Sequence, residues 1–186
     1  MAQAIFAELC SEGEPAVLSD ILTVCYGKDH KRLSNGAIPC YGSGGIMRYV
    51  DEALYNNESV LIPRKGSLNN VLYSNEPFWT VDTMFYTHMT RPNMAKFVYF
   101  TVRALDLVGM NVGSAVPSMT TAVINALEIA LPNDDALASF EENVSPMFLQ
   151  IQVNNAESAN LTTLRDALLP KLMSGELSVV DFSTIK

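Results

Sequence analysis

The feature of this sequence that most restricts its fold is a glycine-free stretch from residue 135 to about residue 169. Apolar residues recur along it at spacings of three and four, the repeat of a helix that packs along one narrow seam. About 35 helical residues would span roughly 50 Å, more than a domain of this size needs for its own packing. We therefore expect a long coiled-coil-type helix that pairs with a second helix, with packing against its own domain as the alternative. The expected interface comprises Phe140, Val144, Met147, Ile151, Leu161, Leu164 and Leu168, with Asn154 and Ser158 as a polar middle.

A domain boundary precedes this helix. Pro132 is followed by Asn133 and Asp134, and either of these two side chains can cap the start of a helix. We therefore expect a first domain over residues 1–133 and a helical dimerisation or spacer region over residues 134–186.

Two prolines and a glycine interrupt the helical region. Pro146 lies inside the apolar repeat, where it predicts either a kink or a new helix that begins with it. Pro170 and Gly175, in "LRDALLPKLMSGEL", predict the end of the helix. We expect the segment around them to dock on a partner.

Residues 1–133 carry the patterns of a mixed domain. A short helical stripe opens the chain, and a second helical period covers residues 94–108. Between them, Gly, Asn and Pro separate short β-patterned segments at hairpin-like intervals. The expected strands are residues 38–41, 46–50, 59–63, 71–74 and 83–87, and "AVINALEIALP" reads as a further strand. The predicted fold class is α+β, a compact β-rich domain with packed helices followed by the long helix.

Composition excludes several classes of protein. A content of 48% hydrophobic and 17% charged residues is that of a globular chain. We find no signal peptide and no run long enough to cross a membrane, so we expect a cytoplasmic protein. The three cysteines form no C-x-x-C pair, and with two histidines they lack the ligand spacing of a zinc site, so we expect reduced thiols and no metal.

The charge is unevenly distributed. The net charge is −8, which by itself disfavours binding to phosphates. Residues 134–186 hold three Lys and Arg against eight Asp and Glu, so most of the acidic excess lies there. Residues 28–65 hold six basic residues against four acidic ones and form the one locally positive region of note.

This positive region holds the candidate DNA contacts. In "PRKGSLNN", Arg64 and Lys65 can bind phosphate and an asparagine can pair with an adenine edge, although a solvated turn with ordinary surface cations is the alternative. The glycines of "IPCYGSGGI" either admit a phosphate or base close to the backbone or only shape a hairpin. The candidate contacts are Lys28, Lys31, Arg32, Ser43, Arg48, Arg64, Lys65, Ser67, Asn69, Asn70 and, in a second Gly/Ser loop, Ser114.

The order of motifs resembles a known family. "IPCYGSGGI", "IPRKGS", "TVDTMFY", "GSAVPSMT", a long helix and "LRDALLPKLMSGEL" follow one another as in the specificity subunit of type I restriction-modification systems. Members usually carry two target-recognition domains and two helical regions, and this chain has room for one of each. "MAQAIF" is similar to the end of the helical region before the second recognition domain, so the chain resembles a C-terminal half.

The resemblance implies a non-catalytic reader of double-stranded DNA. Family members position modification subunits, which methylate adenine with S-adenosylmethionine, and restriction subunits, which use ATP. It therefore implies that S-adenosylmethionine, ATP and Mg²⁺ belong to partner subunits and none to this chain. In the family an antiparallel pair of long helices separates two recognition domains, so a half subunit is expected to form a homodimer that reads a palindrome.

Two alternatives from other classes stay open. An acidic dimeric scaffold that binds only proteins agrees with the net charge. A cysteine hydrolase using Cys25 or Cys40 needs a histidine placed as its base, and no motif orders such a pair. We expect no catalytic residues in this chain.

Overall fold

The computed structural model describes residues 1–11, 13–111 and 116–177. The chain divides into two compact units, Met1–Glu142 and the residues from Asn143 onward. In chain order the elements of the described residues are α1 (Ala2–Cys10), β1 (Glu14–Val17), a 3-10 turn (Leu18–Asp20), β2 (Leu22–Tyr26), β3 (Asn35–Gly42), β4 (Gly45–Val50), β5 (Ser59–Pro63), β6 (Leu72–Ser74), β7 (Trp79–Thr80), β8 (Met84–Met89), α2 (Ala95–Ala104), α3 (Thr121–Asn125), β9 (Glu128–Leu131) and α4 (Asp134–Met173).

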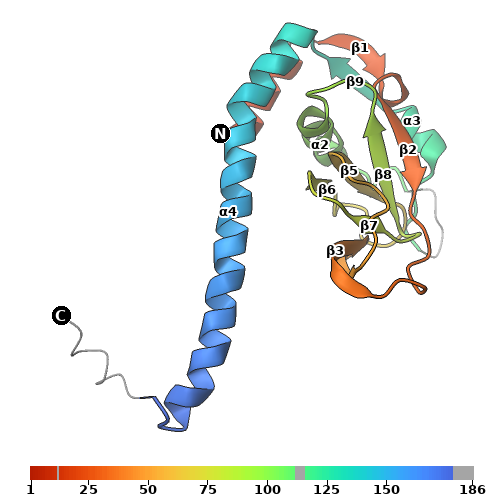
Figure 1. The fold of residues 1–186 in the computed structure, drawn as a ribbon. Helices are drawn as coiled ribbons and strands as arrows, with labels where there is room; N and C mark the ends of the chain where they lie inside the picture. The colour runs from red at the N-terminus through yellow and green to blue at the C-terminus, as the bar shows by residue number, and fades with distance from the viewer. Residues whose placement is uncertain (12, 112–115, 178–186) are drawn as a thin grey trace. The chain divides into compact units, whose positions relative to one another are not determined.

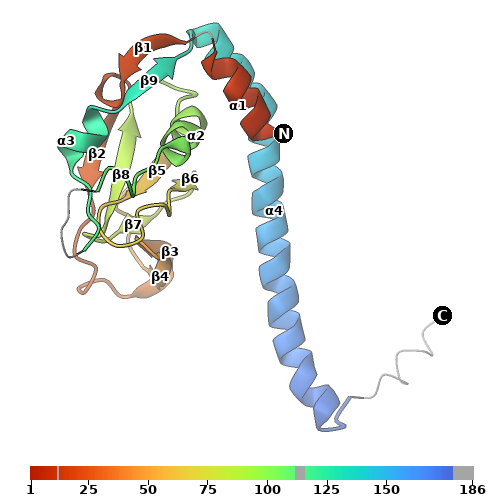
Figure 2. The ribbon, with the colours of Figure 1, turned by 180° about the vertical axis from the view of Figure 1, so that it is seen from behind.

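The first unit is built on a four-stranded antiparallel sheet in the order β2-β8-β5-β6 (Figure 1). A second sheet has the order β4-β3-β7, with β3 and β4 forming a hairpin (Figure 2). The third sheet is a ribbon of β1 and β9, which pairs segments from the two ends of the domain sequence. These pairings produce the α+β class that the sequence predicts.

The core of this unit lies on the central strands. All five residues of β5 are buried, and α2 packs on β5 and β6 through its apolar stripe. Phe78, Phe85 and Phe97 are among the largest fully buried side chains. The single tryptophan, Trp79, is also buried, and its indole Nε1 donates to the carbonyl of Lys28 at 3.0 Å. Aromatic burial on this scale is a large share of the stabilising free energy of a domain of this size.

The sequence patterns predicted most of these elements. All five expected strands are present, as β3, β4, β5, β6 and β8, and α2 covers the first ten or so residues of the expected helix. The expectation of a strand over all of "AVINALEIALP" is wrong in its first half. Thr120 caps a short helix there, its Oγ1 accepting from the amide of Val123 at 3.3 Å, and only the second half forms β9.

Helix α4 runs from Asp134 to Met173 without a break. Asn133 caps it, its Oδ1 accepting from the amide of Ala136 at 2.9 Å, as expected. The alternative of a new helix beginning at Pro146 is wrong, because the helix continues through this residue. The loss of one backbone hydrogen bond and the steric clash of the proline ring cost less than the helical hydrogen bonds on both sides of Pro146 contribute. Pro170 also lies within the helix, which ends before Gly175 in a left-handed conformation (φ 76°).

The apolar seam of α4 divides into a buried and an exposed part. Phe140 is buried, and its ring centroid lies 6.3 Å from that of Phe6 in α1 and 6.0 Å from that of Phe100 in α2. Figure 2 shows α1 beside the first turns of α4. Val144 is also buried, whereas Ile151 and the three seam leucines Leu161, Leu164 and Leu168 are exposed. Met147 is half-buried. Phe140 is therefore a core residue of its own unit, and the exposed part of the seam begins with Ile151.

No helix among the described residues is long and apolar enough to cross a membrane.

Candidate nucleic-acid interface

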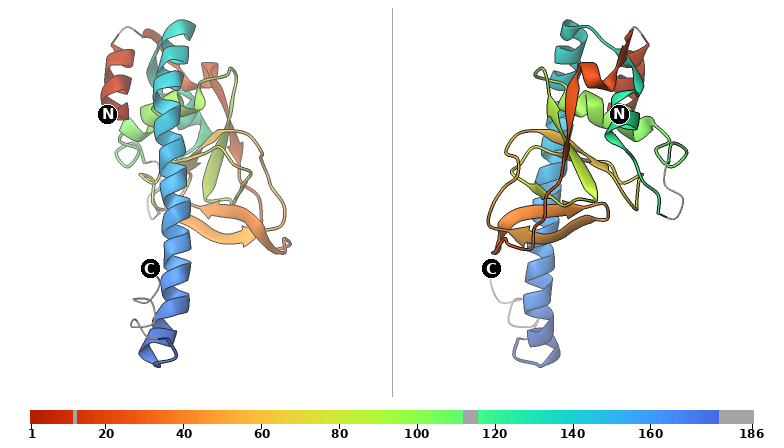
Figure 3. Two further views of the ribbon diagram at one scale, coloured as in Figure 1. Left: turned by 60° about the vertical axis from the view of Figure 1, so that its left-hand side comes forward. Right: turned by 90° about the vertical axis from the view of Figure 1, so that its right-hand side faces the viewer.

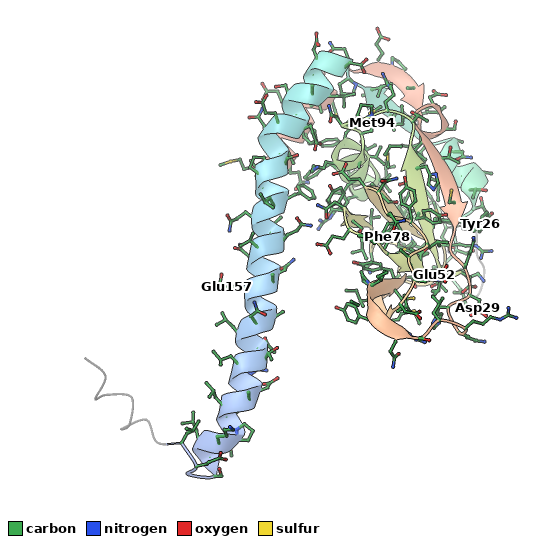
Figure 4. All side chains as sticks on the ribbon, in the orientation of Figure 1. Tyr26, Asp29, Glu52, Phe78, Met94 and Glu157 are labelled. Carbon is green, nitrogen blue, oxygen red and sulfur yellow. The ribbon has the colours of Figure 1, made fainter. Side chains whose placement is uncertain are left out.

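Three strand ends meet at one end of the central sheet. Tyr26, the last residue of β2, pairs with Phe85, and Pro63, the last residue of β5, pairs with Met84, the first of β8. Because these strands are antiparallel, the loops after β2 and β5 and the loop before β8 emerge together. In the view of Figure 1 this is the lower end of β2 and β8, and Figure 4 shows Tyr26 and Asp29 there.

The tip of the β3–β4 hairpin joins these loops. The amide of Ser43 donates to Oγ1 of Thr83 at 3.4 Å, and Nδ2 of Asn70 donates to the carbonyl of Ser43 at 2.9 Å. Figure 3 shows the hairpin at this end of the domain. We call the combined surface, residues 27–34, 42–45, 64–70 and 81–83, the basic edge. The fold brings "GSGG" and "PRKGSLNN" together here although about 20 residues separate them in the sequence.

Glycines fix the shape of the basic edge. Gly45 has φ 115° and Gly66 has φ 86°, conformations that side chains with a Cβ rarely adopt. A Cβ on Gly66 would also lie 3.1 Å from Oγ of Ser43. Gly44 has open space around it. Gly45 is therefore needed for the hairpin turn, and Gly66 for the close contact between the hairpin tip and the 64–70 loop. Gly44 has no such structural requirement and leaves the backbone at the hairpin tip accessible.

Five cations lie on the basic edge against two carboxylates. The cations are Lys28, Lys31, Arg32, Arg64 and Lys65, and the carboxylates are Asp29 and Asp82. Lys28, Lys31 and Arg32 are exposed on the loop that leaves β2. Nζ of Lys65 lies 3.8 Å from Oδ2 of Asp82, both side chains being substantially exposed. An exposed pair at this distance holds its partners weakly, so Lys65 can exchange Asp82 for another anion.

Arg64 differs from the other four cations. Its Nη1 donates to the carbonyl of Asp82 at 3.1 Å, and its guanidinium carbon lies over the ring of Tyr26, 5.3 Å from the centroid. Its backbone amide donates to Thr83 O at 2.9 Å, and its carbonyl accepts from the amide of Met119 at 2.8 Å. Both the backbone and the side chain of Arg64 are therefore held in place.

The remaining candidate contacts have other surroundings. Arg48 is half-buried, and its Nη2 donates to the carbonyl of Leu33 at 2.9 Å and to Oδ1 of Asn35 at 3.2 Å, so it holds the loop after β2 against β4. Asn69 borders a hollow beside the end of α2 together with Arg103 and Asp106. Ser67 is exposed in the 64–70 loop. Ser114 lies outside the described residues.

Comparison with known proteins identifies the family. The model of the "Type I restriction modification DNA specificity domain" matches residues 14–156, which include the whole basic edge. The chain belongs to this family. It is 31% identical over 132 residues to the specificity subunit of the type I restriction enzyme MjaIX from Methanocaldococcus jannaschii and 23% identical over 140 residues to that of the type I restriction enzyme HindI from Haemophilus influenzae. These matches cover 68% and 75% of this chain but only 31% and 26% of the relatives.

Solved structures have the same fold. The S subunit of a type I restriction-modification system from M. genitalium superposes with a TM-score of 0.73 at 20% identity, over 90% of this chain and 47% of that one. The HsdS subunit from Thermoanaerobacter tengcongensis gives 0.56 at 14% identity, over 95% of this chain and 50% of that one. The chain therefore spans about half the length of each of these solved subunits.

The cysteines of this specificity domain are poor nucleophiles. Burial raises the pKa of the Cys25 thiol, an effect that a hydrogen bond with Tyr86 partly offsets. Burial also raises the pKa of the Cys40 thiol, and the nearby charge of Arg48 partly offsets it. Both thiols are therefore protonated at neutral pH, which disfavours the hydrolase alternative, because the thiolate is the attacking form. Among the described residues no group of three or more His, Cys, Asp and Glu could hold a metal ion.

Sequence patterns missed the residues that organise the basic edge. Tyr26, Asp82 and Thr83 contact the 64–70 loop through a ring face and two carbonyl oxygens, and the Thr83 hydroxyl accepts from the amide of Ser43 in the hairpin. None of the three belongs to a motif with a recognisable ligand. The one available signal was the position of Tyr26, an aromatic residue directly before the glycine that opens the basic loop.

Proposed function

We propose that this chain reads one half of a bipartite site in double-stranded DNA as a half-length specificity subunit, through the basic edge. The observation that carries the proposal is that the basic edge, with five cations against two carboxylates, lies within the part of the chain that matches the DNA specificity domain. Clustered Lys and Arg supply the phosphate contacts on which affinity for DNA depends. The acidic excess lies mainly in residues 134–186, away from this surface in sequence.

The shape of the basic edge supports a role in reading DNA. Loops from four separate segments converge there on a sheet whose central strands, β5 and β8, are largely buried, so the contacting groups stand on a rigid base. The surface offers both charge for phosphates and planar donors for base edges. A scaffold that binds only proteins is not favoured, since it does not account for the family match or for a positive surface on an acidic chain.

We further infer a homodimer through the exposed part of the α4 seam. Ile151, Leu161 and Leu164 are 53%, 58% and 54% exposed, and apolar side chains repeated along one helix face gain free energy when a second helix covers them. Two copies related by a two-fold axis would present two identical basic edges. The DNA site would then be a palindrome of two half-sites.

The proposed role also assigns partners. Modification and restriction subunits would supply the chemistry, with S-adenosylmethionine, ATP and Mg²⁺ bound to them, while this chain supplies sequence recognition and no catalytic group. The complex would act on cellular DNA in the cytoplasm.

Selection from a randomised duplex pool tests the proposed function. The full chain, alone and with the modification subunit of the same system, is incubated with the pool at 50 and 200 mM salt, and the bound DNA is sequenced. We expect an enriched palindromic motif and weaker binding at the higher salt concentration. If the assembled complex with the modification subunit enriches no motif, the chain is not a sequence reader.

A further inference from the structure

Arg64 is the one cation of the basic edge whose charged group has a fixed position. Its Nη1 is 3.1 Å from the carbonyl of Asp82, and its guanidinium lies over the Tyr26 ring. Tyr26 is itself held, because its ring packs edge-to-face on Phe85 with centroids 5.1 Å apart. Arg64 also follows directly on Pro63, the last residue of a wholly buried strand. The strand, the carbonyl and the ring together fix where the guanidinium points.

This arrangement leaves most of the guanidinium available. The group has five N–H donors, all in its plane, and the Asp82 carbonyl accepts from one nitrogen only. The guanidinium carbon lies over the Tyr26 ring, 5.3 Å from the centroid, a cation–π contact that adds no oxygen or nitrogen acceptor to the Asp82 carbonyl. Arg64 and Tyr26 are both partly exposed, Tyr26 by 51%, so a ligand can reach the pair.

We propose that Arg64 is a specificity-determining residue that reads a guanine, and that Tyr26 is the residue that positions it. This proposal rests on the proposed function of the basic edge. Two parallel N–H groups of arginine match O6 and N7 of guanine in the major groove, the most frequent base-specific contact in protein–DNA complexes. Such a contact needs the two N–H groups of the guanidinium to point in one direction. The contacts of Arg64 with the Tyr26 ring and the Asp82 carbonyl hold the guanidinium in one orientation.

A phosphate contact would not need this arrangement. A phosphate can be approached from many directions, and the exposed side chains of Lys28, Lys31 and Arg32 and the weakly paired side chain of Lys65 suit that role. Holding a long side chain in one rotamer costs conformational entropy, so the contacts to Arg64 give an advantage only where direction matters. The basic edge thus divides into four exposed or weakly paired cations for the DNA backbone and one held cation for a base.

The same pool selection, applied to variants, tests the proposal. Arg64→Lys keeps the charge and removes the fork. We expect the wild-type motif to contain a guanine in each half-site, and Arg64→Lys to reduce the preference at that one position by about 5- to 150-fold while the other positions stay as they are. Tyr26→Leu should relax the same position, and Tyr26→Phe, which keeps the ring, should retain the wild-type motif.

Lys65→Ala is the matched control from the neighbouring position. It should weaken binding to all sequences equally and lower the salt slope by about one, with the motif unchanged. If Arg64→Lys behaves like Lys65→Ala, Arg64 binds phosphate and the proposal is wrong, although the chain remains a sequence reader. If Tyr26→Leu lowers the melting temperature but leaves every position of the motif unchanged, the ring is structural only and Tyr26 has no positioning role. If the wild-type complex enriches no motif, the proposed function and this proposal are both wrong.

Discussion

At the scale of single residues, conformation and contact decide roles that residue type leaves open. Asn70 has the side chain of an adenine reader, yet its amide group donates to the carbonyl of Ser43 and joins two loops. Arg48 has the charge of a phosphate contact, yet it bonds to Leu33 and Asn35. Arg64 keeps most of its donors available in a fixed plane. The sequence could nominate all three residues but could not rank them, because the partners lie 13 to 38 positions away.

Two neighbouring glycines of the hairpin give a prediction with an internal control. Gly45 has φ 115°, so Gly45→Ala should lower the free energy of unfolding by about 1–2 kcal/mol through backbone strain. Gly44 is not among the residues with positive φ, and no atom lies within 4 Å of where its Cβ would be, so Gly44→Ala should change stability little. Urea unfolding followed by circular dichroism measures both. Equal effects of the two substitutions would contradict the assigned turn.

At the scale of elements, helix α4 combines a core segment with an unpartnered one. Its first turns belong to the domain unit through Phe140, while the seam from Ile151 onward is exposed in the single chain. The heptad pattern predicted a pairing surface along the whole helix. It could not distinguish the part covered within the chain from the part left for a partner, because both parts have the same apolar period.

The inferred dimer depends on that exposed seam. Ile151→Glu combined with Leu161→Glu should convert a dimer into single chains of 20.4 kDa, since carboxylates on facing helices would be desolvated and would repel each other. Light scattering after size exclusion measures the mass.

Gln152 and Thr163 supply the matched control. With 3.6 residues per turn, each lies about 100° or more around α4 from every exposed seam position, Ile151, Leu161, Leu164 and Leu168. Gln152→Glu combined with Thr163→Glu adds the same two carboxylates on another face and should leave the dimer intact. Monomers from this control and dimers from the seam variant would move the interface to that face.

At the scale of the whole molecule, a buried cation connects segments that are far apart in the sequence. Lys96 of α2 is 4% exposed, and its Nζ lies 3.1 Å from Oε1 of Glu58, before β5, and 2.6 Å from Oε1 of Glu141, in the first turns of α4. Its ammonium also lies 5.2 Å from the ring centroid of Tyr73. The hydroxyl of Tyr73 donates to Glu58. The pKa of Tyr73 is raised above its ordinary value, mainly by burial and further by the Glu58 carboxylate.

Removing this cation should destabilise the domain. Lys96→Met keeps the length of the side chain but leaves two carboxylates without their buried partner, which should lower the free energy of unfolding by about 3 kcal/mol. Arg91→Ala is the control, because it breaks an ion pair with Asp134 whose side chains are 43% and 78% exposed, and it should cost less than about 1 kcal/mol. Urea unfolding compares the two. A loss for Lys96→Met no larger than for Arg91→Ala would mean that the Lys96 cluster contributes little.

The sequence by itself determined the α+β class, five strands, and the long helix with a cap at Asn133 or Asp134, because these depend on local periodicity, turn residues and capping groups. Its ordered motifs also indicated the family that the comparison identified. Only the tertiary structure decided that "AVINALEIALP" begins as a helix, that Phe140 is core, and that Tyr26, Asp82 and Thr83 surround Arg64. The physical reason is that these features depend on burial and on hydrogen bonds between segments far apart in the sequence. Which segments meet is decided by how the strands pair, and a local sequence pattern does not specify that pairing.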